Sequence, residues 1–344
     1  GHFGGLRVAD FSDDLTWLAV STRSRGSVWN LASHSRPYSL KGFRGACFAK
    51  DGNLYLDFPK QDKVDRSIVR ADLRQVQMSI VEKVEPKRAW QECEYLVSLK
   101  GNEANDSAKD KRKQADDEQE EDERDYRYEG TKFSWRDVYE PAETNKTLEV
   151  RNAVTGDLLW SKAFNKVLPA IHTDAAMNIA AFRWRLGAPG AKAEMKSLPA
   201  VLKPENGGRD VDYLVEIVEL SSGKFLNALV IDTSNGAIEL RKNLVTKDWL
   251  VAYDSIGRTL IYSLRTGKCV DKFFGNPWSI SASGTLVFRR DTGKMALYDL
   301  TTDKKTDLTL LYPVSTTFFT HDGKKLVLLT NDQVVYTVDA GLPK

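Results

Sequence analysis

The sequence has few cysteines, few histidines and almost no net charge. Its 344 residues include 3 Cys and 4 His, and 50 basic residues nearly balance 48 acidic ones, for a formal charge of +2. This balance gives no overall field to attract a polyanion, so nucleic acid is not favoured as a partner. The number of cysteines is odd, because the chain has only Cys47, Cys93 and Cys269, and the chain is long enough to form a core without disulfides. We therefore expect three free thiols and a reducing, cytoplasmic compartment.

Long apolar runs are also missing. The longest, such as residues 325–330, are far too short to cross a bilayer, so we expect no membrane association. The chain has no charged and then apolar leader. Because it begins with Gly1-His2 rather than with Met, we expect it to be one module of a larger multidomain protein. No stretch has sustained helical periodicity, which excludes the α/β folds.

Motifs for catalysis are absent as well. The four histidines lie far apart, and none has a second His or Cys at the spacing of metal ligands. There is no Gly-x-Ser-x-Gly nucleophile turn and no glycine-rich phosphate loop. We therefore expect no metal, no cofactor and no enzymatic activity.

Repeated turn signals dominate what the sequence does contain. They lie between short β-rich runs and begin at residues 31, 72, 154, 220, 264, 300 and 338. The last four are about 36 to 44 residues apart, the spacing typical of four-stranded propeller blades. Earlier in each unit a second turn, such as Asp51-Gly52 or Asp322-Gly323, indicates a hairpin between the first two strands. The prediction is one all-β domain over residues 1–344, a seven-bladed β-propeller of four-stranded antiparallel blades.

The first unit resembles a WD40 repeat. It has Gly1-His2, a turn at 11–14, a strand at 18–21 and Trp29-Asn30 in place of the closing Trp-Asp, and Tyr298-Asp299 is a similar relaxed form. The resemblance implies a WD40-like propeller that serves as a protein-interaction scaffold. It also implies a structural hydrogen-bonded tetrad, in which His2, Ser21 and Trp29 would hold three places, while Ser24 or Arg25 stands where the Asp is expected.

The seventh unit is one strand short. Counting strands from Leu6 gives six complete units and a last unit of three strands, which ends at 334–339. A propeller avoids an unpaired edge, because open backbone groups invite aggregation. Residues 1–5 are short and glycine-rich, so the hypothesis is that a strand from outside this sequence completes the blade.

Two units are lengthened by insertions. Residues 101–145 interrupt the third unit and residues 187–210 interrupt the fourth, in both cases between the second and third strands. In an antiparallel meander all such loops emerge at one end of the ring, so the two insertions are predicted to be neighbours there. We call this end the insertion-bearing face, and we expect a protein or peptide partner to bind on it.

The candidate contact residues lie in and beside these insertions. Residues 102–124 are a mixed-charge stretch with too few apolar groups to fold, so they form either a solvated spacer or an electrostatic docking tail. The aromatic stretch that follows either contacts a partner or covers the third blade. Trp184 either stacks with an arginine at the rim or packs a blade edge. The predicted binding residues are Tyr126, Tyr128, Phe133, Trp135, Arg136, Tyr139, Arg183 and Trp184.

Two other functions stay open. A propeller enzyme, resembling a quinone-dependent dehydrogenase or a hydrolase, would need polar residues of several blades to converge in the central channel. The Thr-Gly and Trp of residues 154–160 resemble the turn of quinone-dependent propellers, but the motif occurs once. A nucleic-acid site would need the basic residues of the second unit to gather on one face. These basic residues are Lys41, Arg44, Lys60, Lys63, Arg66, Arg70, Arg74, Lys87 and Arg88.

Overall fold

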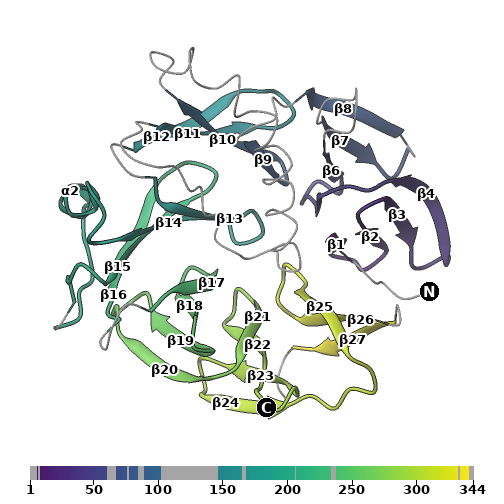
Figure 1. Cartoon of the computed structure of the whole chain (residues 1–344). Helices are drawn as coiled ribbons and strands as arrows, with labels where there is room; N and C mark the ends of the chain where they lie inside the picture. Colours follow the sequence, from purple (N-terminus) through teal and green to yellow (C-terminus); the bar gives the residue numbers. More distant parts are fainter. Residues whose placement is uncertain are drawn as a thin grey trace.

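Seven antiparallel sheets stand around a central axis, one after another in chain order (Figure 1). The structure is a computed structural model, and it describes residues 6, 8–59, 67–75, 77–83, 89–101, 146–164, 168–205, 207–233, 238–331 and 334–340. Six sheets have four strands and the seventh has three among these residues. The predicted all-β, seven-bladed propeller is confirmed.

Each blade is a meander in which the first strand lies nearest the axis. Blade 1 contains β1 (Val8–Phe11), β2 (Trp17–Ser21), β3 (Arg25–Asn30) and β4 (Ser35–Lys41), and blade 2 contains β5 (Gly45–Phe48), β6 (Leu54–Phe58), β7 (Ser67–Asp72) and β8 (Gln77–Lys83). Blade 3 contains β9 (Ala89–Glu92), β10 (Tyr95–Gly101), β11 (Lys146–Asn152) and β12 (Leu158–Phe164), and blade 4 contains β13 (Ala170–Asp174), β14 (Ile179–Arg185), β15 (Tyr213–Glu219) and β16 (Phe225–Ile231).

The remaining blades repeat this order. Blade 5 contains β17 (Leu240–Val245), β18 (Trp249–Asp254), β19 (Arg258–Ser263) and β20 (Cys269–Phe274). Blade 6 contains β21 (Asn276–Ile280), β22 (Thr285–Arg289), β23 (Met295–Asp299) and β24 (Lys304–Asp307), and blade 7 contains β25 (Val314–Phe319), β26 (Lys325–Thr330) and β27 (Val335–Asp339). Gly52 and Gly323 have φ of 84° and 68°, as the predicted Asp-Gly hairpin turns require.

The core lies between the faces of neighbouring blades. Second strands such as β14 are buried on both faces, because a blade packs against each side. Fourth strands such as β20 alternate between exposed and half-buried residues, because their outer face meets solvent. The ring closes where Phe11 of blade 1 meets Phe318 of blade 7, with ring centroids 5.4 Å apart, beside buried Val20 and Val327.

The cysteine prediction is wrong for two of the three residues. Cys47 on β5 and Cys93 in the β9–β10 turn form a disulfide that joins blades 2 and 3, and Cys269 is free. Because the argument for a reducing compartment depended on free thiols, the cysteines no longer support it. The cytoplasmic location stays a prediction. In the part of the chain that the structure describes, no helix is long and apolar enough to span a membrane.

The structure does not join Ser21 and Trp29, the two described residues of the expected WD40-like tetrad. Trp29 pairs with Leu18 and Ser21 pairs with Gly26, so the two side chains lie on opposite faces of blade 1. The Ser21 hydroxyl accepts a hydrogen bond from the backbone N–H of Phe43 at 2.8 Å and donates one to the Thr22 carbonyl at 2.9 Å. Ser21 therefore ties β2 to the connection between blades 1 and 2, which is a structural task. Trp29 is half-buried beneath the guanidinium of Arg36, and His2 lies outside the described residues.

Candidate functional site

A short helix marks the second insertion. Helix α2 (Ala191–Ser197) lies outside the ring beside blades 3 and 4 (Figure 1). Ala191 is buried in the core between these blades, and Met195 and Leu198 pack partly against it. The sequence pattern missed this helix, because seven residues are too few to show a helical period.

A lysine from the neighbouring blade holds this helix in place. The Lys162 ammonium on β12 lies 2.8 Å from a carboxylate oxygen of Glu194 on α2 and 3.1 Å from one of Glu216 on β15. Burial alone lowers the pKa of Lys162, but attraction to the two carboxylates outweighs burial and raises it. Burial raises the pKa of Glu216, and Lys162 offsets only part of that effect. The three charges together fix α2 to two blades.

The insertion then returns along the outer edge of blade 4. The Leu202 N–H donates to the Ala228 carbonyl and the Val230 N–H donates to the Leu202 carbonyl, both at 2.9 Å. These bonds cover part of the free edge of β16. The apolar residues of the insertion are therefore used in packing, and side chains such as Lys192 and Lys196 remain exposed.

Two of the predicted binding residues lie inside the blades. The Trp184 side chain is 4% exposed, and its ring centroid lies 6.1 Å from those of both Phe164 and Phe182. Trp184 therefore packs a blade, which was one of its two interpretations. Arg183 faces the other way, where its guanidinium donates to the Leu240 carbonyl at 2.6 Å. The other six predicted residues, Tyr126, Tyr128, Phe133, Trp135, Arg136 and Tyr139, lie outside the described residues.

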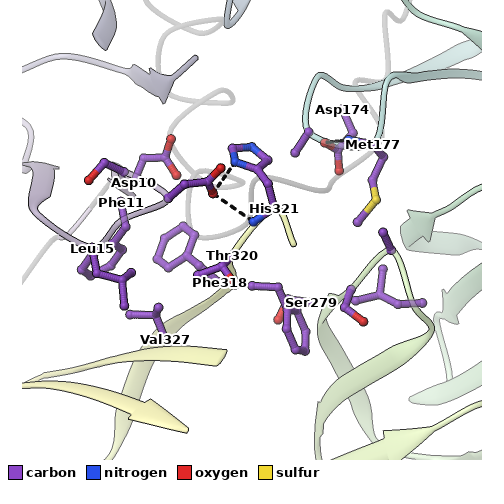
Figure 2. Close-up of a pocket in the computed structure, with 17 residues that line it drawn as sticks. Asp10, Phe11, Leu15, Asp174, Met177, Ser279, Phe318, Thr320, His321 and Val327 are labelled. Carbon is purple, nitrogen blue, oxygen red and sulfur yellow. Dashed lines mark hydrogen bonds and ion pairs between the residues drawn. The ribbon is translucent and has the colours of Figure 1, made fainter. Parts of the chain in front are cut away.

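A pocket opens at the opposite end of the ring, where the first and second strands of each blade are joined (Figure 2). Turns of blades 1, 4, 6 and 7 line it, and Phe11, Phe318 and Met177 give it apolar walls. The sequence interpretation missed this pocket because it sought function in long loops. The pocket is built from short turns that only the closed ring brings together.

One acid–base pair spans blades 1 and 7 at the rim of this pocket. The His321 backbone N–H donates to a carboxylate oxygen of Asp13 at 2.9 Å, and the imidazole Nδ1 contacts the same oxygen (Figure 2). The Asp13 side chain is 51% exposed. The pair therefore joins the first and last blades on the solvent side.

The other polar groups of the pocket hold the turns in place. Asp174 accepts a hydrogen bond from the Met177 N–H at 3.1 Å, and Asp10 accepts one from the Phe48 N–H at 3.0 Å. Ser279 shares a 2.7 Å hydrogen bond with the Thr317 hydroxyl of blade 7. Among the described residues, no three His, Cys, Asp or Glu side chains form a group that could hold a metal ion. These contacts are structural and do not align a nucleophile with a base.

The ring of seven meander blades is a WD40-like β-propeller fold. No family model and no curated protein matches the sequence. Among solved structures, the WD40 β-propeller domain of Doa1 is similar, with a TM-score of 0.50 and 10% identity over 98% of this chain and 93% of that one. The computationally designed Ika8 protein has a TM-score of 0.49 and 11% identity over 98% and 97% of the two chains. At these identities the likeness concerns the fold alone.

Proposed function

We propose that this chain is a non-catalytic scaffold that docks a protein or peptide partner on its insertion-bearing face. The WD40-like fold supports a protein-interaction scaffold in general terms. The more specific support is the position of the insertions. Strands β10 and β14 belong to adjacent blades, and both run toward the same end of the ring, where the two insertions begin.

The single observation that carries the proposal is the fixed helix of the second insertion. Glu194 of α2 is bound by Lys162 of blade 3, while the following residues pair with β16 of blade 4. A surface that is held rigid before binding loses less conformational entropy when a partner docks. The other insertion contains aromatic and arginine residues at 126–139, which are of the types that dominate interface energies.

The two other functions receive less support. The pocket at the opposite end places polar groups of several blades together, but Asp10, Asp174 and Ser279 are engaged in structural hydrogen bonds. In the second unit, Arg44 is paired with Asp57 on β6 at 3.2 Å, so that basic residue is neutralised within its own blade. A non-catalytic protein-binding function therefore remains the proposal.

Affinity capture with matched variants tests this proposal. Tagged wild-type chain and the double variant Trp135→Ala/Tyr139→Ala are compared by quantitative mass spectrometry of bound proteins. The control is Ile256→Ala/Phe274→Ala, which removes two side chains more than half exposed on blade 5. We expect a specific partner to be lost at least tenfold with the first variant and retained with the control. An unchanged set of partners in the Trp135/Tyr139 variant would disprove binding through this segment.

A further inference from the structure

Blade 7 has an open backbone edge among the described residues. Its last strand, β27, pairs with β26 on one side, and no described strand pairs with the other. The Thr330 N–H donates to the Val334 carbonyl and the Ala340 N–H donates to the Lys324 carbonyl. In an antiparallel ladder these bonds alternate along the strand. The backbone groups of Val335, Thr337 and Asp339 therefore point to the open edge.

The repeat identifies the side chain that a fourth strand would cover. In each of six blades the residue after the third strand donates its N–H to the carbonyl before the second strand, which aligns the blades residue by residue. These residues are Leu31, Ala153, Leu220, Leu264, Leu300 and Ala340. Two positions earlier stand Trp29, Arg151, Val218, Tyr262, Tyr298 and Val338 respectively.

Burial at this position varies between the blades. Val218, Tyr262 and Tyr298 are 2%, 4% and 3% exposed, whereas Trp29, Arg151 and Val338 are half-buried. Tyr298 shows what provides the cover, because the Phe273 ring, on the fourth strand of the preceding blade, lies 5.9 Å from it. Trp29 follows blade 7, which has three strands among the described residues, so no described fourth strand covers it.

A cation beside Trp29 indicates the charge that a fourth strand of blade 7 would carry. In blade 6, Lys305 lies over the Tyr298 ring at 4.3 Å and is neutralised by Asp271, 2.8 Å away on the fourth strand of blade 5. In blade 1, Arg36 lies over the Trp29 ring at 5.5 Å in the corresponding arrangement. Within the described part of the chain, Arg36 forms no ion pair. A carboxylate that corresponds to Asp271 would stand on a fourth strand paired with β27.

We propose that the open edge of β27 binds an extended segment of a partner polypeptide in which an acidic residue and an apolar residue alternate, as Asp271 and Phe273 do. The segment runs antiparallel to β27 and pairs with Val335, Thr337 and Asp339. Its carboxylate meets Arg36, and its apolar side chain, two residues further on, covers Trp29. Strand addition of this kind takes affinity from backbone bonds and specificity from alternate side chains. This surface continues the blade-to-blade interface already present six times, and it is separate from the insertion-bearing face.

A peptide copied from the chain itself is the probe. It contains residues 267–275 with Cys269→Ser and a fluorescent label, and its binding to the whole chain is followed by anisotropy. We expect saturable binding that is weakened at least tenfold by Arg36→Glu. A second peptide that also carries Asp271→Lys should restore binding to the Arg36→Glu chain, because the two charges are exchanged.

A backbone variant tests strand pairing independently of charge. Thr337→Pro removes an N–H that points to the open edge, so it spares the bonds to β26 and should abolish peptide binding. Thr337→Val keeps the N–H and should bind normally, and the circular dichroism melting curve shows whether each variant is folded. Binding that is equal in wild type, Arg36→Glu and Thr337→Pro would overturn the proposal.

Failure of the peptide to bind would also overturn it, and two further measurements identify the occupant in that case. Slow hydrogen exchange at Val335, Thr337 and Asp339 in the free monomer would show that residues of the same chain already fill the edge. Concentration-dependent dimerisation in sedimentation that Thr337→Pro removes would show that a second copy fills it.

Discussion

At the scale of single residues, the buried lysine of β17 is the least expected side chain in the core. Lys242 is 6% exposed, and its ammonium donates to the Pro277 carbonyl of blade 6. Among the described residues no carboxylate offsets the burial of Lys242, which lowers its pKa to about 7. A cation without a counter-ion in a low-dielectric core is costly, so the folded protein favours the neutral amine.

The first prediction concerns this lysine and pH. Because the unfolded lysine keeps its ordinary pKa, the unfolded state binds more protons between about pH 7 and pH 10. The free energy of unfolding should therefore rise with pH in that window. Lys242→Met should remove this rise. It should also increase the free energy of unfolding at pH 6 by about 1 to 3 kcal/mol, measured by urea unfolding. The exposed Lys272→Met is the control, and an unchanged slope in Lys242→Met would contradict the prediction.

At the scale of elements, the structure shows how α2 depends on a side chain of another blade. Lys162 lies between Glu194 of the helix and Glu216 of β15, and the Glu216 side chain is 5% exposed. Removing the lysine leaves a buried carboxylate without its cation, which is far more costly than loss of a surface ion pair.

The second prediction follows from this arrangement. Lys162→Met should lower the free energy of unfolding by about 3 kcal/mol at pH 8. The deficit should shrink near pH 4, because burial raises the pKa of Glu216 and a protonated Glu216 no longer needs the cation. Faster amide exchange in 191–197 would show that the helix has loosened. Glu194→Gln is the control, and an equal deficit at both pH values would refute the electrostatic explanation.

At the scale of the whole molecule, the disulfide joins two blades that packing alone would otherwise hold together. Cys47 and Cys93 are 46 residues apart, and they lie on opposite sides of the boundary between blades 2 and 3. In the loop-entropy description, a crosslink that closes a loop of this length raises the free energy of the unfolded chain by about 4 kcal/mol.

The third prediction is that reduction destabilises the propeller. Cys47→Ser, or a strong reductant, should lower the free energy of unfolding by several kcal/mol, up to about 4, in chemical denaturation. Cys269→Ser should have almost no effect, because Cys269 is free and lies on an outer strand. Alkylation of the unfolded, unreduced protein followed by mass spectrometry should detect one free thiol. Three alkylated cysteines would contradict the disulfide.

The repeat was predictable because each blade is a local structure. Turn residues such as Gly52 and Gly323 and the alternation of apolar residues act within about ten residues of one another. The period of these signals indicated both the number of blades and the short seventh blade. In contrast, helix α2 depends on Lys162, which lies 32 residues before Glu194 in the chain, and no local pattern expresses that contact.

The residues of the candidate sites also divide into those that local sequence predicted and those that it did not. Sequence patterns singled out Trp184, but they did not decide between surface and core for that residue, since an aromatic side chain suits either. The pairing of Cys47 with Cys93, the Asp13–His321 contact and the unmatched Arg36 beside Trp29 were decided only by tertiary structure. Local sequence determines strands and turns, because their hydrogen bonds and backbone angles are local. Closing the ring determines which blades meet, and partners across a blade boundary are therefore known only once the ring is formed.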